Sequence, residues 1–215
     1  MKQKRTANPK RTRRDEIIQT ALKMFAENGY EATTLDEVAH ELGVTRPALY
    51  HHIKSKEEIL QVIINRSAKM VEGLIRTGRS DLPPRQRMEA LVRMLVEFPT
   101  RYSDSVRIGF EQTALVHQRT QDAFRRRQKE VERVMQQTLK EGVEQGVFAI
   151  AIDDIKMVAF AILGACTSIY HWYQPDGYLS PTQVVDHYVR FFESGYIKNP
   201  VEVGASSTGP EREGI

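Results

Sequence analysis

The sequence predicts an all-α protein in which an N-terminal three-helix helix-turn-helix domain is joined to a C-terminal helical bundle, with about nine helices in all. Three observations support this prediction. Apolar residues recur at helical spacing along most of the chain, no segment alternates convincingly as a strand would, and residues 33–60 hold a succession of helix caps around one glycine. We expect the first domain over residues 13–58 and the second over residues 59–198.

The chain begins with a basic segment that precedes the first expected helix. The first fourteen residues of the chain hold seven Lys or Arg and no acidic residue. They carry a charge of +7, and the rest of the chain carries −4, which gives the net charge of +3. We expect residues 1–12 to form a disordered arm, either one that contacts phosphates or one that only aids solubility. The first helix then runs from about Arg13 to Asn28, where Gly29 can close it.

The next segment holds two short helices joined by a tight turn. Thr34 and Glu37 have the spacing of a capping box, and Gly43 permits the positive φ angle that ends the helix. Thr45 can then cap a second short helix, and Ser55 can cap a third helix directly after it. Two short helices around such a turn are typical of a helix-turn-helix, whose second helix can enter the major groove of DNA.

The remaining chain is predicted to form further helices and a polar end. Apolar residues at helical period mark these helices, and Pro84 and Pro181 stand where a proline is tolerated at a helix start. We expect residues 199–215, rich in Gly, Ser, Pro and charge, to be a disordered tail. The expected helices cover about residues 56–77, 84–98, 105–115, 120–145, 154–173 and 181–194.

The composition excludes several classes of protein. The single cysteine, Cys166, rules out an internal disulfide and fits a reducing cytoplasm. No run of about 18 apolar residues could span a bilayer and no secretory signal is visible, so we expect a cytoplasmic protein without a membrane partner. Nucleotide-binding, zinc-protease and serine-hydrolase motifs are absent, so we expect no catalytic residue, no metal and no cofactor.

A set of residues among the first sixty positions has a specific order and spacing. These residues are Phe25, Gly29 and Tyr30 within the segment TALKMFAENGYEATT, the pair Thr33 and Thr34, Gly43 with Val44, Leu49 to His52, and Lys54 to Glu57. Together they resemble the N-terminal domain of TetR-family transcriptional regulators over residues 13–60. Ile53 stands where that family often has Phe, and Val38 where it often has Ile. Both residues are apolar, so the expected fold is unchanged.

The resemblance implies that the helix after Gly43 reads DNA. Arg46 is the strongest candidate for base recognition, because a bidentate contact between arginine and guanine gives about 1–3 kcal/mol of discrimination. By their position in the family motif, Thr45 and Ala48 also face bases. The residues placed toward backbone phosphates are Tyr50, His51, His52, Lys56 and Thr34. Outside this motif, the same side chains would be interpreted as an exposed arginine, a packed tyrosine and a solvated lysine.

The resemblance also implies a homodimer that reads a palindromic site in double-stranded DNA. The expected interface is the last two helices, because one carries small residues that allow close approach and the other has aromatic residues on more than one side. The alternative is that both helices belong only to the core. The small residues are Ala159, Ala161, Gly164, Ala165 and Ser168.

For the body of the protein, the resemblance implies a pocket for a small hydrophobic effector that releases a repressor from its DNA. Candidate pocket residues are polar or aromatic groups amid apolar helices, although each one alone is more often an ordinary core residue. They are Phe98, Tyr102, Phe110, Gln112, His117, Phe124, Arg125, Cys166, Tyr170 and Trp172. Two alternatives stay open: a constitutive DNA-binding protein without an effector, and a TetR-like repressor that responds to many drugs.

One local segment indicates a more specific chemical class of effector. Trp172 to Gly177 has a W-Y-x-P-x-G pattern that is similar to one in regulators of fatty-acid and sterol breakdown, which respond to acyl-CoA thioesters. A basic cluster on or before the long polar helix would then hold the CoA head group while the body takes the acyl chain; alternatively, this cluster is a solvated face. Its members are Arg119, Arg125, Arg126, Arg127, Lys129 and Arg133.

Overall fold

The computed structural model describes residues 12–196, and this part of the chain is all-helical. It holds ten α-helices and two single-turn 3₁₀ helices. The basic arm and the polar tail expected at the two ends lie outside the described residues, except for Thr12. The helices are α1 (Arg13–Asn28), α2 (Leu35–Glu41), α3 (Arg46–His52), α4 (Lys56–Gly78), α5 (Pro84–Arg101), α6 (Ser103–Glu111), η1 (Thr113–Leu115), α7 (Gln118–Glu144), η2 (Ile152–Asp154), α8 (Ile155–Thr167), α9 (Ile169–Trp172) and α10 (Pro181–Tyr196).

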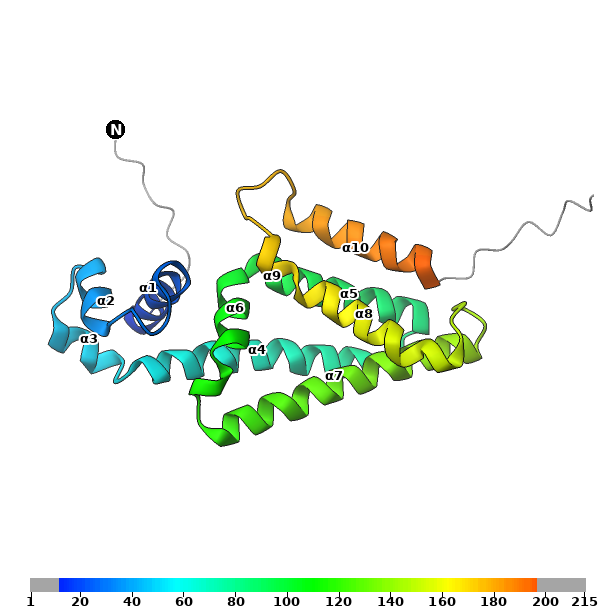
Figure 1. The fold of residues 1–215 in the computed structure, drawn as a ribbon, viewed down its shortest axis with the longest axis horizontal. Helices are drawn as coiled ribbons and strands as arrows, with labels where there is room; N and C mark the ends of the chain where they lie inside the picture. The colour runs from blue at the N-terminus through cyan, green and yellow to red at the C-terminus, as the bar shows by residue number, and fades with distance from the viewer. Residues whose placement is uncertain (1–11, 197–215) are drawn as a thin grey trace, which may run out of the picture.

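Figure 1 shows two parts that α4 connects: we call α1 to α3 the head, and α5 to α10 the body. The head lies at one end, and α4 starts there and continues through the length of the body. In the body, α4 packs on α5 and α7, α8 packs on the same two helices, and α10 covers α5. The short helix α6 crosses this bundle and contacts both α4 and α1.

Helix caps determine the local geometry of the head. The hydroxyl of Thr34 accepts a hydrogen bond from the Glu37 N–H at 3.2 Å, while the Glu37 carboxylate accepts one from the Thr34 N–H at 2.7 Å, so the predicted capping box is confirmed. Thr45 caps α3 by accepting from the N–H of Ala48 at 3.4 Å. Between the two helices, Gly43 has a φ of 64°, a left-handed conformation that glycine adopts without strain. These elements form the helix-turn-helix that the sequence predicts.

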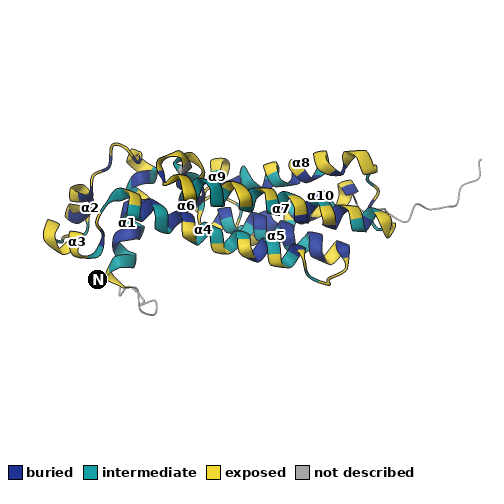
Figure 2. Ribbon diagram, turned by 90° about the horizontal axis from the view of Figure 1, so that it is seen from below, coloured by how far each residue is buried: buried dark blue, intermediate teal, exposed yellow. Residues whose placement is uncertain are grey.

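Two hydrophobic clusters hold the described part of the chain together, one in the head and one in the body. Val38 and Ile53, the two departures from the family pattern, are both completely buried in the head cluster. This cluster also includes Ile108 and Val116 from beyond α4, so the head and the body share an apolar contact. Figure 2 shows buried residues in α1 at one end of the molecule and along α5 in the body.

Helix α4 belongs to both parts. Its 23 residues correspond to about 35 Å of helix at the standard rise per residue. Ile59, Leu60 and Ile64 near its start lie in the head cluster, and Leu74 near its end lies in the body cluster. A displacement of α4 within the body therefore moves the head that packs on its first turns.

One helix that the sequence predicts as continuous is interrupted at Ser168, where α8 ends and α9 follows. The hydroxyl of Thr167 donates to the carbonyl oxygen of Leu163 at 2.8 Å, and that of Ser168 donates to the carbonyl oxygen of Ala165 at 2.9 Å. Hydroxyls that bond to the backbone in this way compete with the helical hydrogen bonds and bend helices. The single predicted helix is therefore present as two, with a change of direction between them.

In residues 12–196, no helix combines the length and the apolar character that crossing a bilayer requires. The same residues contain no group of three His, Cys, Asp or Glu side chains that could hold a metal ion.

Candidate functional site: the surface of α3 and a cavity in the body

Helix α3 presents most of its side chains to solvent. Of its seven residues only Leu49 is buried, and this side chain anchors the helix in the head cluster. Arg46, Ala48, Tyr50 and His51 are all exposed. The structure therefore places five of the eight residues predicted to contact DNA on one short helix, and Thr45 is its N-cap. Thr34 and Lys56 lie outside it, at the starts of α2 and α4.

The guanidinium of Arg46 is held weakly at this surface. Its Nε lies 3.0 Å from Oδ1 of Asp36 on α2, and its Cζ lies 5.4 Å from the centre of the Tyr50 ring. The Arg46 side chain is 66 % exposed, and ion pairs that are this exposed contribute only about 0–1 kcal/mol. Arg46 can therefore exchange Asp36 for the edge of a base at little cost, while the Tyr50 ring supports its orientation.

Two histidines form the last turn of α3. Their rings meet edge to face with centroids 5.2 Å apart. His51 is exposed and His52 is half-buried. Imidazole N–H groups at this end of the helix are suited to donate to phosphate oxygens that flank a groove, because such contacts position a reading helix without reading sequence.

Lys56 has a different environment from the one that the sequence suggests. Its Nζ donates to the carbonyl oxygens of Tyr30 at 2.8 Å and Glu31 at 3.1 Å, and it lies 4.7 Å from the centre of the Tyr30 ring. The ammonium group thus fastens the start of α4 to the turn between α1 and α2. Two of its three N–H donors are used in this way, so one remains for a phosphate.

Thr34 is also engaged within the head. Its hydroxyl donates to Oε2 of Glu37 at 2.9 Å, in addition to capping α2. Two hydrogen bonds from Thr34 hold the pKa of the Glu37 carboxyl below its usual value, because both favour the charged form. The bond from the backbone N–H has the larger effect, and the bond from the hydroxyl has the smaller one. A phosphate that accepted the Thr34 hydroxyl would therefore compete with Glu37 for it.

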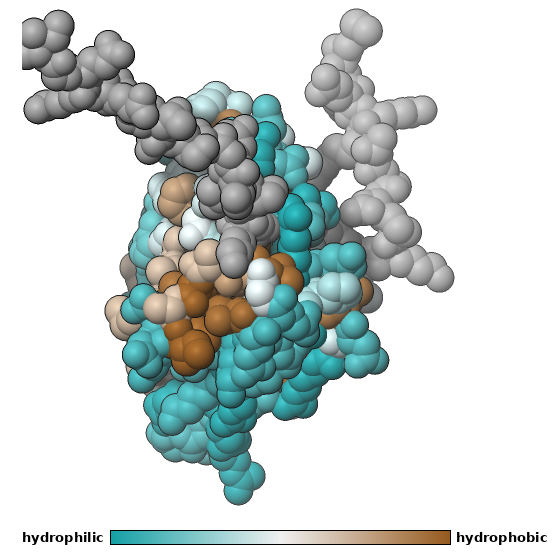
Figure 3. Space-filling model, turned by 90° about the vertical axis from the view of Figure 1, so that its right-hand side faces the viewer, coloured by the Kyte–Doolittle hydropathy of each residue, from teal (hydrophilic) through white to brown (hydrophobic). Residues whose placement is uncertain are grey.

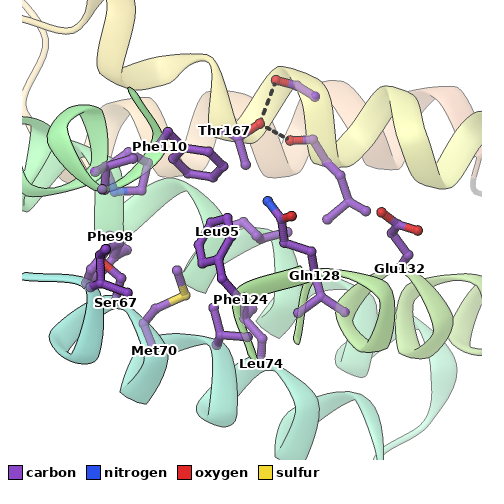
Figure 4. A pocket seen from close by; sticks show the side chains of 18 of the residues that line it. Ser67, Met70, Leu74, Leu95, Phe98, Phe110, Phe124, Gln128, Glu132 and Thr167 are labelled. Carbon is purple, nitrogen blue, oxygen red and sulfur yellow. Dashed lines mark hydrogen bonds between the residues drawn. The ribbon is translucent and has the colours of Figure 1, made fainter. Parts of the chain in front are cut away.

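A cavity of about 310 Å³ lies in the body, between α4, α5, α6, α7 and α8. Its wall is mainly apolar, and Figure 4 shows aromatic rings toward one side and polar side chains of α7 toward the other. Pockets with such a wall and a few convergent polar groups are typical of small-molecule sites. The polar side chains that line it are Ser67, Gln128, Glu132 and Thr167.

Three of the ten predicted effector-binding residues line this cavity, namely Phe98, Phe110 and Phe124. The rings of Phe110 and Phe124 meet edge to face with centroids 5.6 Å apart. Tyr170 is not part of the lining, but its ring stacks on that of Phe110 with 5.9 Å between the centroids. Aromatic side chains from α5, α6 and α7 therefore converge on one side of the cavity.

Most of the other predicted effector-binding residues lie on the outside of the molecule. Those that are exposed are Tyr102, His117, Arg125 and Trp172. Arg125 pairs with Asp122 one turn away, at 2.6 Å. Gln112 follows the last turn of α6, where its N–H donates to the carbonyl oxygen of Ile108 at 3.0 Å. The structure does not bring these residues to the cavity.

Cys166 faces the core of the body instead of the cavity. It is completely buried in the body cluster, and this burial raises the pKa of its thiol. Because α8 is apolar around most of its circumference, periodicity alone does not show which of its sides faces the cavity. Phe160, Leu163, Gly164 and Thr167 are the residues of α8 on that side.

Sequence reasoning missed Gln128 and Glu132, the two polar side chains that α7 directs into the cavity. They follow Phe124 at intervals of four residues, so they share one side of the helix with it. This spacing is a usable signal. It is weak, however, because polar residues on a long charged helix are usually solvated.

Three of the six members of the basic cluster predicted on α7 pair with acidic residues. Arg127 lies 3.5 Å from Glu72 on α4, and Arg125 and Arg133 each pair with an acidic residue of α7 itself. No member of the cluster lines the cavity. Five of the six members are exposed and Arg127 is half-buried, so the side chains of the cluster lie at the surface of α7.

Exposed apolar side chains occur on α8 and α10. Met157 and Phe160 on α8 are 66 % and 39 % exposed, and Phe191 on α10 is 71 % exposed. Figure 3 views the molecule from the end at which α7 turns into α8, and it shows apolar residues grouped near the middle of that face. Of the small residues predicted for close helix approach, Ala161 and Gly164 are exposed, Ala165 and Ser168 are half-buried, and Ala159 is completely buried in the core.

Helix α6 connects the cavity with the head. Val106 and Phe110 line the cavity. Between them, Ile108 packs into the head cluster, and Nη2 of Arg107 donates to the carbonyl oxygen of Ala26 on α1 at 2.9 Å. One short helix therefore contacts both the cavity and the part of the protein that carries α3.

Two models of known protein families match the chain. The model of bacterial regulatory proteins of the tetR family matches residues 17–63. The model of the tetracyclin repressor-like C-terminal domain matches residues 81–196, which is more than half of the chain.

Individual proteins show the same similarity over most of their length. The HTH-type transcriptional repressor KstR2 of Mycolicibacterium smegmatis is 30 % identical over 189 residues, which cover 86 % of this chain and 90 % of that protein. The structure of the ketosteroid transcriptional regulator KstR2 of Mycobacterium tuberculosis matches with a TM-score of 0.74 at 26 % identity, over 91 % of this chain and 100 % of that one. A structure of AibR in complex with isovaleryl coenzyme A and operator DNA matches with a TM-score of 0.68 at 28 % identity, over 84 % of this chain and 97 % of that one.

Proposed function

The chain belongs to the TetR family of bacterial regulatory proteins, and on this basis we propose how it regulates transcription. It is a repressor that binds a palindromic operator as a homodimer, and a small hydrophobic effector releases it from the DNA. We assign DNA binding to residues 13–58, and effector binding and dimerisation to residues 59–198. The curated relatives named as repressors support the direction of the regulation.

The observation that carries this proposal is that the same elements contribute to the cavity and to the head. Val106 and Phe110 of α6 line the cavity, while Ile108 of the same helix packs into the head cluster. Ile64 of α4 does both, since it lines the cavity and belongs to the head cluster. A ligand that changes the shape of the cavity therefore acts directly on helices that position α3.

We propose that α3 lies in the major groove, with Arg46 as the main reader of base sequence. The ion pair with Asp36 uses Nε, which leaves the terminal Nη groups of Arg46 for a guanine. Thr45 and Ala48 stand beside it at the start of the helix, where a recognition helix contacts base edges. The residues proposed to face the flanking phosphates are Tyr50, His51, His52, Lys56 and Thr34.

The proposed dimer interface is formed by α8 and α10. Met157, Phe160 and Phe191 are large apolar side chains that a single chain leaves exposed, and Met and aromatic residues are enriched in protein interfaces. Because Ala161 and Gly164 are exposed and small, a partner helix can approach α8 closely. A symmetric dimer presents two copies of α3, and half-sites one helical turn apart require a separation of about 34–36 Å.

We propose an acyl-CoA thioester as the class of effector. AibR, to which this chain is 28 % identical, has been solved with isovaleryl coenzyme A and operator DNA. The apolar wall of the cavity suits an acyl chain, and the Trp172 to Gly177 segment favours the same class. The basic cluster of α7 offers cations to the CoA phosphates, for which Arg127 would exchange Glu72.

Effector binding must favour one conformer of the dimer over another to have any effect. A ligand shifts such an equilibrium only by the difference between its affinities for the two conformers. In the proposed mechanism, the occupied cavity favours positions of α4 and α6 in which the two α3 helices no longer match the half-site spacing. A shift from 99 % to 1 % of the DNA-binding conformer needs a preference of about 10⁴-fold.

Selection of bound duplexes from a random library, followed by fluorescence anisotropy with the selected site, tests this function. We expect a site with twofold symmetry, displacement by isovaleryl-CoA or longer acyl-CoA thioesters, and no displacement by CoA alone. If no sequence is preferred at physiological salt, the protein is not an operator-specific repressor. If binding is specific but no thioester releases the DNA, the assigned effector class is wrong.

A further inference from the structure

Two polar side chains of α7 stand unpaired in the mainly apolar cavity. Gln128 and Glu132 are one turn apart, and both point into the space between α7 and α8 (Figure 4). Within residues 12–196, neither side chain has a hydrogen-bond or ion-pair partner, and no Lys or Arg lines the cavity. The wall therefore carries one uncompensated carboxylate beside one free amide.

The other two polar groups of the wall are already satisfied by the backbone. The hydroxyl of Ser67 donates to the carbonyl oxygen of Ile63 at 3.3 Å, and that of Thr167 donates to the carbonyl oxygen of Leu163 at 2.8 Å. Neither donor is directed at Glu132. A partner for this carboxylate must therefore come from solvent or from a ligand.

A ligand that fills the cavity displaces the water that hydrates these groups. A desolvated carboxylate without a hydrogen-bond donor is unfavourable, and more so than a neutral group in the same position. An ionised carboxylate only accepts hydrogen bonds, whereas an amide both donates and accepts. A tightly bound ligand must therefore bring a donor to Glu132.

We propose that Glu132, together with Gln128, recognises a hydrogen-bond donor on the effector and excludes a carboxylate. The apolar part of the effector lies against Phe98, Phe110 and Phe124, and its N–H or O–H group reaches Glu132. A carboxylate in this position would face Glu132 with like charge, and the wall offers no cation to offset the repulsion.

This inference deepens the proposed function, and it rests on this cavity being the effector site. In an acyl-CoA, the amide N–H groups of the pantetheine arm supply the donors, and the thioester replaces the charged carboxylate of the free acid. The cavity would then distinguish an activated acyl group from the fatty acid itself. That is the discrimination that a sensor of activated acids needs.

Isothermal titration calorimetry of the full chain with three eight-carbon probes tests the inference. Octylammonium, octanol and octanoate share one apolar chain and differ in their head group. We expect octylammonium to bind about tenfold more tightly than octanoate, with octanol between them. In Glu132→Gln, which keeps the shape of the side chain and removes its charge, we expect this preference to disappear.

Glu144→Gln is the matched control. It removes the same charge from an exposed position near the end of α7, where Glu144 pairs with Lys140 at 3.8 Å and does not line the cavity. We expect this variant to keep the wild-type order of affinities. A wild-type preference for octanoate, equal affinities or no binding for all three probes, or the same change in both variants would overturn the inference. Release of the operator by thioesters is measured in a separate experiment. The assignment of acyl-CoA as effector can therefore be wrong while the head-group preference of Glu132 is confirmed, and the head-group preference can be absent while acyl-CoA is the effector.

Discussion

The guanidinium of Arg107 on α6 donates a hydrogen bond of 2.9 Å to the backbone carbonyl of Ala26 on α1. Three residues farther along α6, Phe110 lines the cavity of the body. Since Ala26 stands in the last turns of α1, the bond joins the cavity wall to the helix that precedes the helix-turn-helix. A charged donor makes such a bond stronger than one between neutral groups.

We expect Arg107→Ala to weaken the response to the effector more than it weakens DNA binding. Without the guanidinium, α6 can shift without displacing α1, and substitutions of this kind change coupling by about 0.5–2 kcal/mol. Anisotropy titrations of the operator with and without isovaleryl-CoA measure the ratio of the two affinities. Arg101→Ala is the control, because Arg101 is exposed and pairs with Glu97 of its own helix. An unchanged ratio in Arg107→Ala would show that the bond does not transmit the signal.

Arg46→Ala is expected to relax base preference. Loss of a bidentate contact to guanine removes about 1–3 kcal/mol of discrimination at one position of each half-site, with a smaller effect on random duplex. Competition between the operator and single-base variants gives this discrimination directly. Lys23→Ala removes an exposed cation of α1 and serves as the control. If Arg46→Ala lowers the affinity for all sequences equally, Arg46 contacts phosphate and not a base.

Lys56→Ala is expected to affect both DNA binding and stability. It removes one phosphate contact, so affinity falls for every sequence and the slope of log affinity against log salt decreases by about one unit. It also removes two hydrogen bonds to the carbonyls of Tyr30 and Glu31, which lowers the free energy of unfolding by about 1–2 kcal/mol. Denaturant titration and salt-dependent anisotropy separate the two effects. A wild-type salt slope with reduced stability would assign Lys56 a structural role alone.

The charge of Glu37 stabilises the head only while it is ionised. Hydrogen bonds from Thr34 hold the pKa of Glu37 below 4.5 in the folded chain. A lowered pKa stabilises the folded state fully above the unfolded value of 4.5, and this contribution is lost as the pH falls through the lower folded value. We therefore expect the stability difference between wild type and Glu37→Gln in denaturant titrations to shrink as the pH falls from neutral to below 4.5. A difference that does not vary with pH contradicts this assignment.

Phe191→Glu is expected to convert the dimer to a monomer. Phe191 is 71 % exposed on α10, so the substitution leaves the core of one chain intact, but it places an unpaired charge in the proposed interface at a cost of about 3–5 kcal/mol. Sedimentation equilibrium measures the oligomeric state. Tyr178→Glu, at a residue that is 94 % exposed in the loop before α10, should remain dimeric. A dimeric Phe191→Glu would place the interface elsewhere.

The helix-turn-helix is predictable from the sequence because its signals are local. The reciprocal bonds of Thr34 and Glu37, the positive φ of Gly43 and the cap at Thr45 each depend on residues within a few positions of one another. Apolar periodicity in the same segment identifies Val38 as a core residue, and the structure buries it.

The cavity is less predictable, because its wall is made of separate helices whose rotation the sequence does not specify. On α8, an apolar residue can face the core, as Cys166 does, or the cavity, as Leu163 does. On α7, Glu132 is a residue of a type that is usually solvated, but its side chain lines the cavity. The interruption at Ser168 also depends on hydroxyls that can bond either to the backbone or to solvent. Packing of the surrounding helices determines which of these bonds forms, and the local sequence does not specify that packing.

The proposed function requires that the cavity and α3 are coupled through the positions of α4 and α6. Such coupling is reciprocal: operator and effector must change each other's affinity by the same factor. Its most direct test is calorimetric titration of isovaleryl-CoA into the free protein and into the protein saturated with its palindromic operator. We predict weaker effector binding to the DNA-bound protein, by the factor by which the effector weakens DNA binding. Equal effector affinity with and without the operator would contradict this coupling.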